Sequence, residues 1–319
     1  MTRFTLKSKG IHLEIDSHGA WISRVSRPGG DNLLADRTWA SPPRPTAHSS
    51  YGSSVANFHA SYNAGWHLLF PNAGAACEVL GAPIPFHGEV ASHDWTVVKS
   101  QKDFAEMRTV SRLPLEIVRT ARASGDSIRI EDTVRNLAPM TVPYIIGHHP
   151  VFPLSNEMRL DLPASIPEVL QLSGSGFRAE EVLSRIGAGE IGLEKTFGLH
   201  AEQQIEGLIS LKDIEGAWFA ARSICGRTSV GVCWDQKSMP HMWVWLQNRG
   251  TEFPWFGRAQ YLGLEPQSVP TPEGLDAAIK ARQHLELLPG ESRTCWIEMR
   301  LFEDNGQVIG LDPVVGTLG

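Results

Sequence analysis

The sequence predicts an all-β fold, either a sandwich or a barrel. Strand-like runs follow one another in quick succession, and turn signals separate them about every ten residues, a spacing typical of both architectures. Helical patterns are rare: only residues 179–186 and 275–280 predict short helices. No internal repeat and no low-complexity linker divides the chain, so we expect one domain over residues 1–319.

The strand candidates show the alternation of apolar and polar residues that a half-buried strand requires. Between two of them, residues 37–54 contain Pro42, Pro43 and Pro45 and are expected to form a long surface loop. The expected strands are residues 11–15, 20–25, 66–70, 95–98, 104–110, 115–120, 128–134, 141–146, 208–211, 218–224, 229–234, 243–246, 261–266 and 295–301.

Composition narrows the classes of function. The net charge of −6 argues against a nucleic-acid partner, which requires clustered lysines and arginines. No stretch is apolar for long enough to span a membrane and no signal peptide is recognisable, so we expect a cytoplasmic protein. The four cysteines form no Cys-x-x-Cys pair, and no histidine spacing on a helix predicts a metal site.

Three stretches end by presenting an ionisable side chain next to a proline or a glycine. His87 follows two prolines and precedes a glycine, and His149 and Glu265 each end an apolar run directly before a proline. Functional side chains tend to occur on such irregular, rigid segments. These three residues are therefore the first candidates for chemistry.

The two adjacent histidines, His148 and His149, follow an apolar run. Successive side chains of a strand point to opposite faces, so at most one of the two faces a given pocket. Pro150 lacks a backbone donor, which places this stretch at a strand end or at a sheet edge. The plainer interpretation is that one histidine is buried and hydrogen-bonded while the other is exposed.

Glu265 follows apolar residues, and partial burial would raise the pKa of its carboxyl group. A carboxylate opposite an imidazole can act as an acid/base pair. Considered singly, Glu265 is also a structural carboxylate that pairs with Arg249 or Arg258, and His87 is also a loop histidine without a ligand.

Together these stretches resemble the motifs of the aldose 1-epimerase (galactose mutarotase-like) family. That family has an Asn in a turn ahead of a His-Gly motif, then a Gly-x-His-Pro-aromatic-Phe motif and a late Glu-Pro motif. The matching segments here occur in the same order over most of the chain: residues 70–74 with Asn72, residues 87–88, residues 147–152 and residues 264–266. The resemblance implies a large β-sandwich, the galactose mutarotase-like supersandwich, with a few short helices.

The resemblance also implies an activity, the interconversion of the α and β anomers of an aldose without metal or cofactor. Glu265 would be the general base that takes the proton of the anomeric hydroxyl. His149 would be the general acid that protonates the ring oxygen. His87 and Asn72 would contribute to substrate binding.

The chain departs from the family pattern at three points. No arginine follows the Asn-x-Gly turn, the residue before Phe152 is Val151 and not an aromatic, and Asp235 is a weak counterpart of the family's sugar-binding aspartate. Further candidates for stacking on the sugar or binding its hydroxyls are Trp66, Trp234 and Gln247.

Two other functions stay open at this point. One is a sugar-binding protein of the same fold with weak catalysis. The other is a mutarotase for a phosphorylated or sulfonated hexose, whose anionic group would need arginines such as Arg44, Arg178, Arg249 or Arg258. The expected partner is a small-molecule sugar, with no nucleic acid and no membrane, and we expect a monomer or a homodimer.

Overall fold

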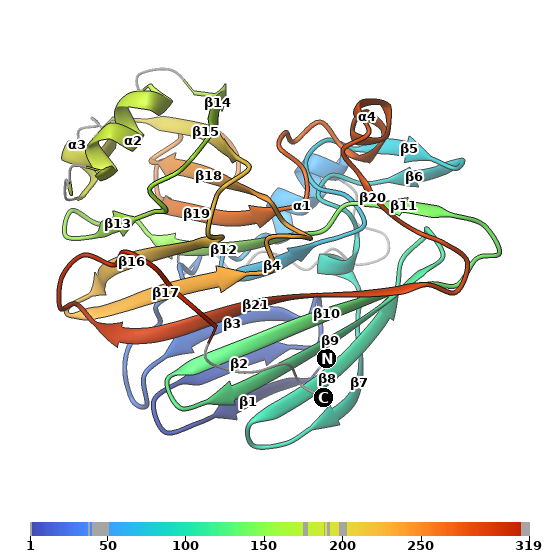
Figure 1. Ribbon diagram of the computed structural model, residues 1–319, viewed down its shortest axis with the longest axis horizontal. Helices are drawn as coiled ribbons and strands as arrows, with labels where there is room; N and C mark the ends of the chain where they lie inside the picture. The colour runs from blue at the N-terminus through green and yellow to red at the C-terminus, as the bar shows by residue number, and fades with distance from the viewer. Residues whose placement is uncertain are drawn as a thin grey trace.

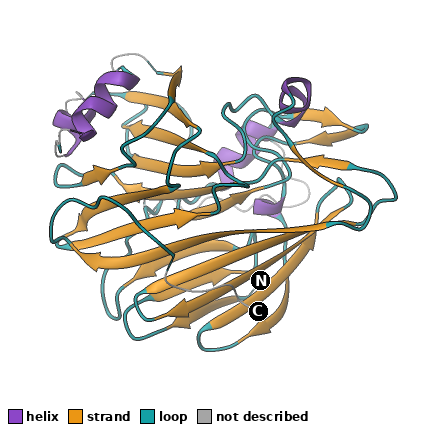
Figure 2. Cartoon of the chain, viewed as in Figure 1, coloured by secondary structure: helices purple, strands orange, loops and turns teal. Residues whose placement is uncertain are grey.

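The computed structural model describes residues 2–37, 39, 51–174, 178–187, 189, 192–197 and 203–313. Over these residues, strands far outweigh helices (Figure 2), as the sequence predicts. Most strands belong to two large antiparallel sheets that pack face to face as a β-sandwich (Figure 1). The all-β prediction is confirmed, and the architecture is the large sandwich.

The first sheet has nine strands. In spatial order they are β1 (Arg3–Lys7), β2 (His12–Asp16), β3 (Trp21–Ser26), β4 (Trp66–Leu69), β12 (Gly147–Pro153), β19 (Gln260–Gln267), β18 (His241–Asn248), β15 (Ile205–Lys212) and β14 (Glu168–Ser173). The second sheet has eight strands: β13 (Arg159–Asp161), β16 (Trp218–Cys225), β17 (Thr228–Trp234), β21 (Ser292–Glu303), β10 (Ser127–Asn136), β9 (Leu115–Ser124), β8 (Phe104–Val110) and β7 (Thr96–Ser100).

Two hairpin-sized sheets and several short helices surround these layers. The small sheets pair β5 (Cys77–Val79) with β6 (Ala82–Ile84) and β11 (Val142–Tyr144) with β20 (Leu285–Leu287). The helices are α1 (Ser54–Ser61), the 3₁₀ turn η1 (Val90–Ser92), α2 (Ala179–Gly187), α3 (Gly192–Phe197) and α4 (Leu275–Ala281). The two predicted helices are confirmed as α2 and α4. In the part of the chain that the structure describes, no helix has the length and apolarity needed to cross a bilayer.

The structure describes only part of the expected loop over residues 37–54, because residues 38 and 40–50 lie outside the described residues. Its last residue, Ser54, begins helix α1, which the sequence analysis did not predict. The Ser53 hydroxyl caps the helix by accepting a hydrogen bond from the Ala56 amide at 3.1 Å. Ala60 is the only buried residue of α1, so the helix carries no apolar stripe for a periodicity search to find.

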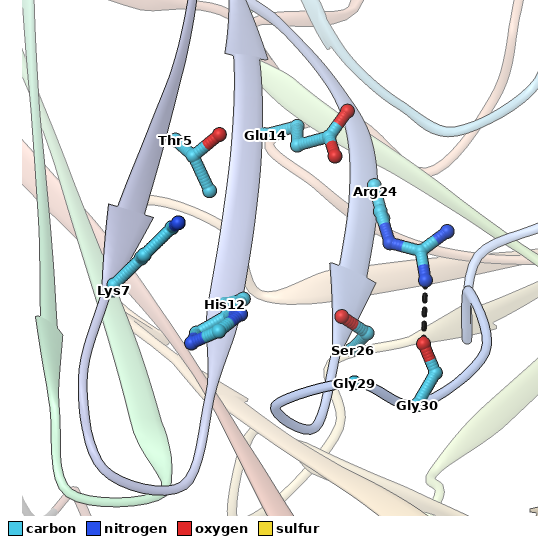
Figure 3. Close-up of a pocket in the computed structure, with 8 residues that line it drawn as sticks. All are labelled: Thr5, Lys7, His12, Glu14, Arg24, Ser26, Gly29 and Gly30. Carbon is cyan, nitrogen blue, oxygen red and sulfur yellow. Dashed lines mark hydrogen bonds between the residues drawn. The ribbon is translucent and has the colours of Figure 1, made fainter.

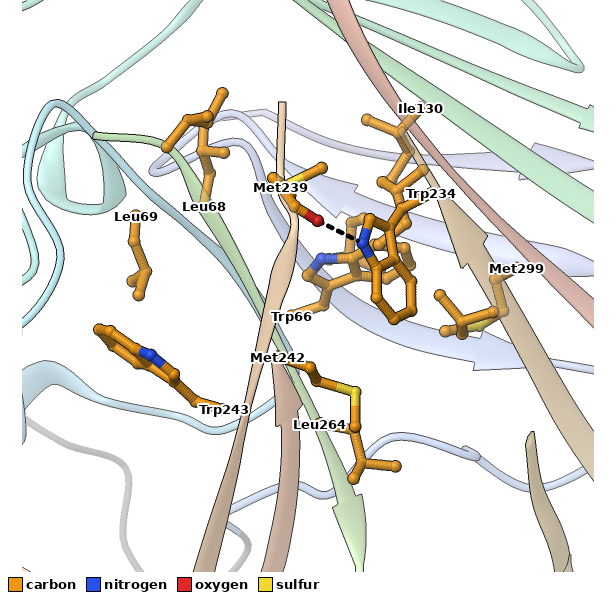
Figure 4. Close-up of a cluster of buried hydrophobic side chains, with 14 of the residues drawn as sticks. Trp66, Leu68, Leu69, Ile130, Trp234, Met239, Met242, Trp243, Leu264 and Met299 are labelled. Carbon is orange, nitrogen blue, oxygen red and sulfur yellow. Dashed lines mark hydrogen bonds between the residues drawn. The ribbon is translucent and has the colours of Figure 1, made fainter. Parts of the chain in front are cut away.

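Alternation along the strands creates two different environments. Leu262 and Leu264 of β19 point into the core between the sheets, where they join Trp66, Trp234 and Met242 (Figure 4). A fully buried side chain of this size contributes roughly 1.5–3 kcal/mol to stability. The intervening residues of β19 point away from the eight-stranded sheet, to a side that we call the outer face of the nine-stranded sheet.

Strand β12 lies in the middle of this sheet, between β4 and β19. The prediction that Pro150 marks a strand end or a sheet edge is therefore wrong. The register of β12 and β19 is continuous on either side, but the ladder is open over residues 148–150 and 264–266. Pro150 and Pro266 both lie in this gap. Proline has no backbone N–H to donate, so each of the two lies where the ladder already lacks hydrogen bonds.

Candidate active site on the outer face of the nine-stranded sheet

His149 and Glu265 meet in the open part of the β12–β19 ladder. Their strands are in register so that the two residues lie opposite each other on the outer face. His149 Nε2 lies 3.4 Å from Glu265 Oε1. The structure thus brings together two residues that are more than a hundred positions apart in the sequence, and it gives Glu265 an imidazole neighbour. The interpretation that Glu265 pairs with Arg249 or Arg258 is not what the structure shows; among the residues that it describes, the polar contacts of Glu265 are with His149 and Gln267.

Burial sets the protonation of this pair. Glu265 is only 2% exposed, and burial raises the pKa of its carboxyl group well above the ordinary value, although a hydrogen bond donated by Gln267 Nε2 at 3.3 Å opposes the shift. Burial also lowers the pKa of His149 to about 4. Both shifts disfavour the charged forms, so burial favours a neutral imidazole beside a neutral carboxyl group.

Gly147 makes room for the Gln267 side chain. These two residues lie opposite each other in the β12–β19 ladder. A Cβ atom on residue 147 would lie 1.8 Å from Gln267 Oε1. The absence of a side chain on β12 therefore allows the Gln267 amide to lie across the strand and reach the Glu265 carboxyl group.

His87 approaches the pair from the segment between β6 and η1. Its backbone is left-handed, with φ of +61°, and a Cβ on the following Gly88 would lie 2.2 Å from the Phe70 carbonyl oxygen. The backbone therefore approaches Phe70 so closely at Gly88 that only a glycine fits there. The Gly74 amide donates to His87 Nδ1 at 3.0 Å, so the proton of the neutral ring is on Nε2. The His87 and His149 ring centroids are 5.9 Å apart.

Asn72 supports this segment from beneath. Its side-chain amide donates to the carbonyls of Ala75 and Pro85 at 2.8 and 3.1 Å, and its oxygen accepts from the Leu275 amide at 2.7 Å. The side chain is fully buried. The polar atoms of the Asn72 side chain are therefore hydrogen-bonded to the protein itself, and they hold the His87 segment in place.

Trp234 and Asp235, at the end of β17, lie elsewhere. Trp234 is part of the core between the sheets, where its indole N–H donates to the Met239 carbonyl at 2.8 Å (Figure 4). The Asp235 carboxylate accepts from the Ser238 hydroxyl at 2.7 Å within a turn. Trp66 also faces the core and donates to His148 Nδ1 at 3.1 Å. The structure does not bring these three predicted residues to the His149–Glu265 pair.

Gln247 does lie on the outer face, two strands from β12. It donates through Nε2 to Glu206 at 3.1 Å and accepts from the Gly250 amide at 2.9 Å. The second oxygen of Glu206 accepts from the Trp245 indole at 3.3 Å. Glu206 was missed in the sequence, although an acidic residue between Ile205 and Gly207 in a strand is a recognisable signal.

Aromatic rings enclose the pair. Tyr62 and Trp245 both contact the His149 ring, with centroid distances of 5.7 and 5.6 Å. Trp255 packs on both of them, at 5.8 Å from Tyr62 and 5.6 Å from Trp245. The sequence analysis did not single out any of these three for the site, because nothing local distinguishes them from core aromatics. They form a largely apolar wall that excludes water from the acid/base pair.

Several buried polar atoms beside the pair make no hydrogen bond among the described residues: Tyr62 Oη, His149 Nδ1, Gln267 Oε1 and both nitrogens of His67. His67 lies on β4 directly opposite His149, and burial lowers its pKa to about 3. The Ala64 carbonyl is near the His67 ring but does not complete a hydrogen bond. Buried polar groups are nearly always paired in folded proteins, so such a cluster indicates a site for a polar ligand.

The predicted arginines are scattered. Arg178 lies 4.0 Å from Glu181 on α2, Arg258 is exposed, and Arg44 is outside the described residues. An arginine that the sequence analysis did not consider, Arg37, donates through Nη1 to the carbonyls of His59 and Tyr62, both at 3.2 Å. These bonds place a cation beside the aromatic wall.

A separate hollow of about 240 Å³ lies on β1, β2 and β3 (Figure 3). Its lining is polar and mixed in charge: Thr5, Lys7, His12, Glu14, Arg24, Ser26, Gly29 and Gly30. None of the residues that the sequence predicts for the site is among them.

The fold is shared with solved structures. The chain superposes on a protein from Synechocystis (TM-score 0.67, 17% identity, covering 95% of this chain and 96% of that one). It also superposes on a candidate aldose 1-epimerase from Escherichia coli (0.63, 15%, 95% and 99%) and on a galactose mutarotase-like protein from Lactobacillus casei (0.63, 16%, 94% and 100%). No protein-family model matches the sequence, and no curated protein matches it. At these identities the likeness establishes the galactose mutarotase-like fold.

Proposed function

We propose that this protein interconverts the α and β anomers of an aldose by acid/base ring opening and closure. The observation that carries the proposal is the buried His149–Glu265 contact at 3.4 Å, surrounded by aromatic rings and by polar atoms that the described residues leave unpaired. A hydroxyl-rich ring with apolar faces matches both features of this surface. The shared fold with mutarotase-like proteins agrees with the proposal.

The reaction needs one proton removed and one delivered. Glu265 takes the proton of the anomeric hydroxyl, the bond between the anomeric carbon and the ring oxygen breaks, and His149 protonates that oxygen as the aldehyde forms. Rotation about the adjacent carbon–carbon bond exposes the other face of the aldehyde. Closure then runs through the same two residues with their roles exchanged: Glu265 returns its proton to the carbonyl oxygen and His149 takes one from the ring hydroxyl, so the pair regains its starting protonation.

These roles require the proton to lie on His149 before reaction, whereas burial places it on Glu265 in the free protein. Sugar hydroxyls that hydrogen-bond to both groups stabilise their charged forms, so binding of the sugar favours transfer of the proton from Glu265 to His149. His87, with its proton on Nε2, is placed to donate to a sugar oxygen. Glu206 accepts from Trp245 and Gln247 and is placed to accept from a hydroxyl at the rim of the site.

The test is the rate of mutarotation of freshly dissolved aldoses, followed by polarimetry or NMR against a buffer blank. The panel contains neutral hexoses and pentoses and the corresponding sugar phosphates. Acceleration of at least one sugar, abolished in Glu265→Gln, supports the proposal. Full activity in that variant, or no acceleration of any sugar, would show that the mechanism is wrong.

A second candidate is a sugar-binding protein with little catalysis. The neutral state of the His149–Glu265 pair favours it, because a neutral pair is less effective than an ionised one unless the ligand shifts the proton. Calorimetric binding of a sugar without any acceleration of its mutarotation would identify this function. A phosphorylated or sulfonated hexose is the alternative substrate, and preference for the sugar phosphates, lost in Arg37→Met, would identify it.

A further inference from the structure

The histidine next to the proposed acid faces the opposite side of its strand. His148 is fully buried in the core, and its Nδ1 accepts the hydrogen bond from the Trp66 indole at 3.1 Å. The proton of the neutral ring is therefore on Nε2, which lies 3.3 Å from Asp132 Oδ2. This close contact falls outside hydrogen-bond geometry, but it places His148 of β12 directly against Asp132 of β10 in the other sheet.

Asp132 is held in turn by Arg119 of β9. The guanidinium donates through Nε and Nη2 to the two carboxylate oxygens, both at 2.8 Å, and through Nη1 to the Ala20 carbonyl at 3.3 Å. Arg119 and Asp132 are 0% and 1% exposed. Burial alone would raise the pKa of Asp132, but the charge of Arg119 and the hydrogen bonds hold it below its usual range.

A buried ion pair is a poor source of stability, because removing two charges from water offsets most of their attraction. This one lies directly behind the point where the β12–β19 ladder is open, so backbone hydrogen bonds to β19 do not fix β12 at residues 148–150. On the other side, β12 pairs with β4 over residues 147–150. The position of β12 relative to β19 is therefore set there by β4 together with contacts from the core side.

We propose that Arg119, Asp132 and His148 are positioning residues, which hold β12 from the core side and thereby fix the His149–Glu265 contact on the outer face. The proposal concerns the geometry of that contact, and it rests on the proposed function only for its kinetic test. None of the three residues touches the substrate.

The control is Asp161, which forms a buried bidentate pair with Arg222 in the same sheet, at 2.6 and 3.3 Å, away from β12. Arg222 also contacts Asp304 at 2.9 Å, so the control should lose less stability than Asp132→Asn. Asp132→Asn and Asp161→Asn are compared for thermal unfolding, kcat and KM. Both variants are expected to lose stability. Only Asp132→Asn is expected to lower kcat, by roughly ten- to a hundredfold with KM unchanged, the size of effect that a small misplacement of a reacting group causes.

A second readout does not require activity. In the same variants, NMR of the His149 imidazole should show altered ring resonances and an altered titration in Asp132→Asn and wild-type behaviour in Asp161→Asn. If Asp132→Asn does not fold, His148→Gln, which keeps an acceptor and a donor, should preserve the His149 signals, and His148→Leu should change them.

The two proposals fail separately. If the wild-type protein accelerates no sugar but His149 responds selectively to Asp132→Asn, the positioning inference stands and the proposed function is wrong. If His149 and kcat respond equally to both Asp variants, or to neither, the positioning inference is overturned whatever the activity.

Discussion

Three buried carboxylates of the two large sheets, Asp132, Asp161 and Glu265, differ in their partners. In the eight-stranded sheet, Asp132 and Asp161 each receive two hydrogen bonds from an arginine, Arg119 and Arg222 respectively. In the nine-stranded sheet, Glu265 is equally buried, and among the described residues its contacts are an imidazole and an amide. The pKa of Asp132 is lowered while that of Glu265 is raised.

This difference separates a structural carboxylate from one that can exchange a proton. An arginine partner favours the ionised form of a carboxylate, and it helps to lower the pKa of Asp132, so such a group is poorly suited to exchange a proton near neutral pH. A neutral partner leaves the carboxyl group able to gain or lose a proton near neutral pH. The cluster of unpaired polar atoms on the outer face surrounds the second kind of carboxylate, and the following experiments test whether that distinction is real.

The largest expected effect is on catalysis by Glu265→Gln. Gln keeps the shape and burial of the side chain but cannot take a proton, so mutarotation should fall roughly 10²- to 10⁴-fold. The same measurement on Asp161→Asn should give a rate close to wild type. Equal losses of activity in the two variants would mean that the partner of a buried carboxylate does not distinguish a catalytic group from a structural one.

The second effect is on stability, and here Asp161→Asn, not Glu265→Gln, should show the larger loss. Asp161→Asn removes the more buried of the two carboxylates that contact Arg222, and Asp304 at 2.9 Å remains, so the variant should lose up to about 3 kcal/mol in the free energy of unfolding. Glu265→Gln breaks no ion pair and should leave the protein at least as stable as the wild type. Urea denaturation of both variants measures this, and a large loss in Glu265→Gln would show that Glu265 is structural.

A smaller effect is the pH dependence of that stability. The pKa of Glu265 is raised in the folded state, so its contribution is most favourable below the unfolded value near 4.5 and is lost as pH rises toward the folded value. The glutamine that replaces it in Glu265→Gln cannot titrate, and both proteins retain His149. The unfolding temperature of Glu265→Gln relative to wild type should therefore increase from about pH 4 to about pH 8. A constant difference would contradict the raised pKa.

The smallest effect is expected from His87→Phe, which keeps a ring in the segment but removes the Nε2 donor, together with the Nδ1 acceptor of the Gly74 amide. Loss of one hydrogen bond to a sugar oxygen should lower kcat/KM about tenfold. Steady-state kinetics measure this, with Asp235→Asn as the control that should change kcat/KM less than about twofold because Asp235 lies in a remote turn. A larger loss of kcat/KM in Asp235→Asn would support the original prediction that Asp235 contributes to substrate binding.

The sequence predicted the strands and the three central side chains for physical reasons that are local. Alternation marks a half-buried strand, and a proline or glycine next to His87, His149 and Glu265 marks the places where regular structure gives way. The prediction of opposite faces for the two adjacent histidines followed from strand geometry, and His148 and His149 do point to opposite sides.

Long-range register explains what was missed. His67 reaches the site only because β4 pairs with β12, and Tyr62 reaches it because helix α1 ends beside that pair; neither has a local mark. The same alternation that identified β17 directs the Trp234 side chain into the core, so a tryptophan chosen for its chemistry proved to be structural. The prediction that Pro150 marks a strand end was wrong because Pro150 lies near Pro266 in a gap of the ladder between two central strands. That pairing is visible only in the tertiary structure.

The packing of Gln267 against Gly147 has a consequence for how such a site could be tuned. An added methyl at position 147 would displace the Gln267 amide, and with it the hydrogen bond that lowers the pKa of Glu265. A residue without any functional group thereby controls the proton affinity of the site. Substitution there offers natural variation a way to shift the working pH toward the alkaline side while every reacting group stays unchanged.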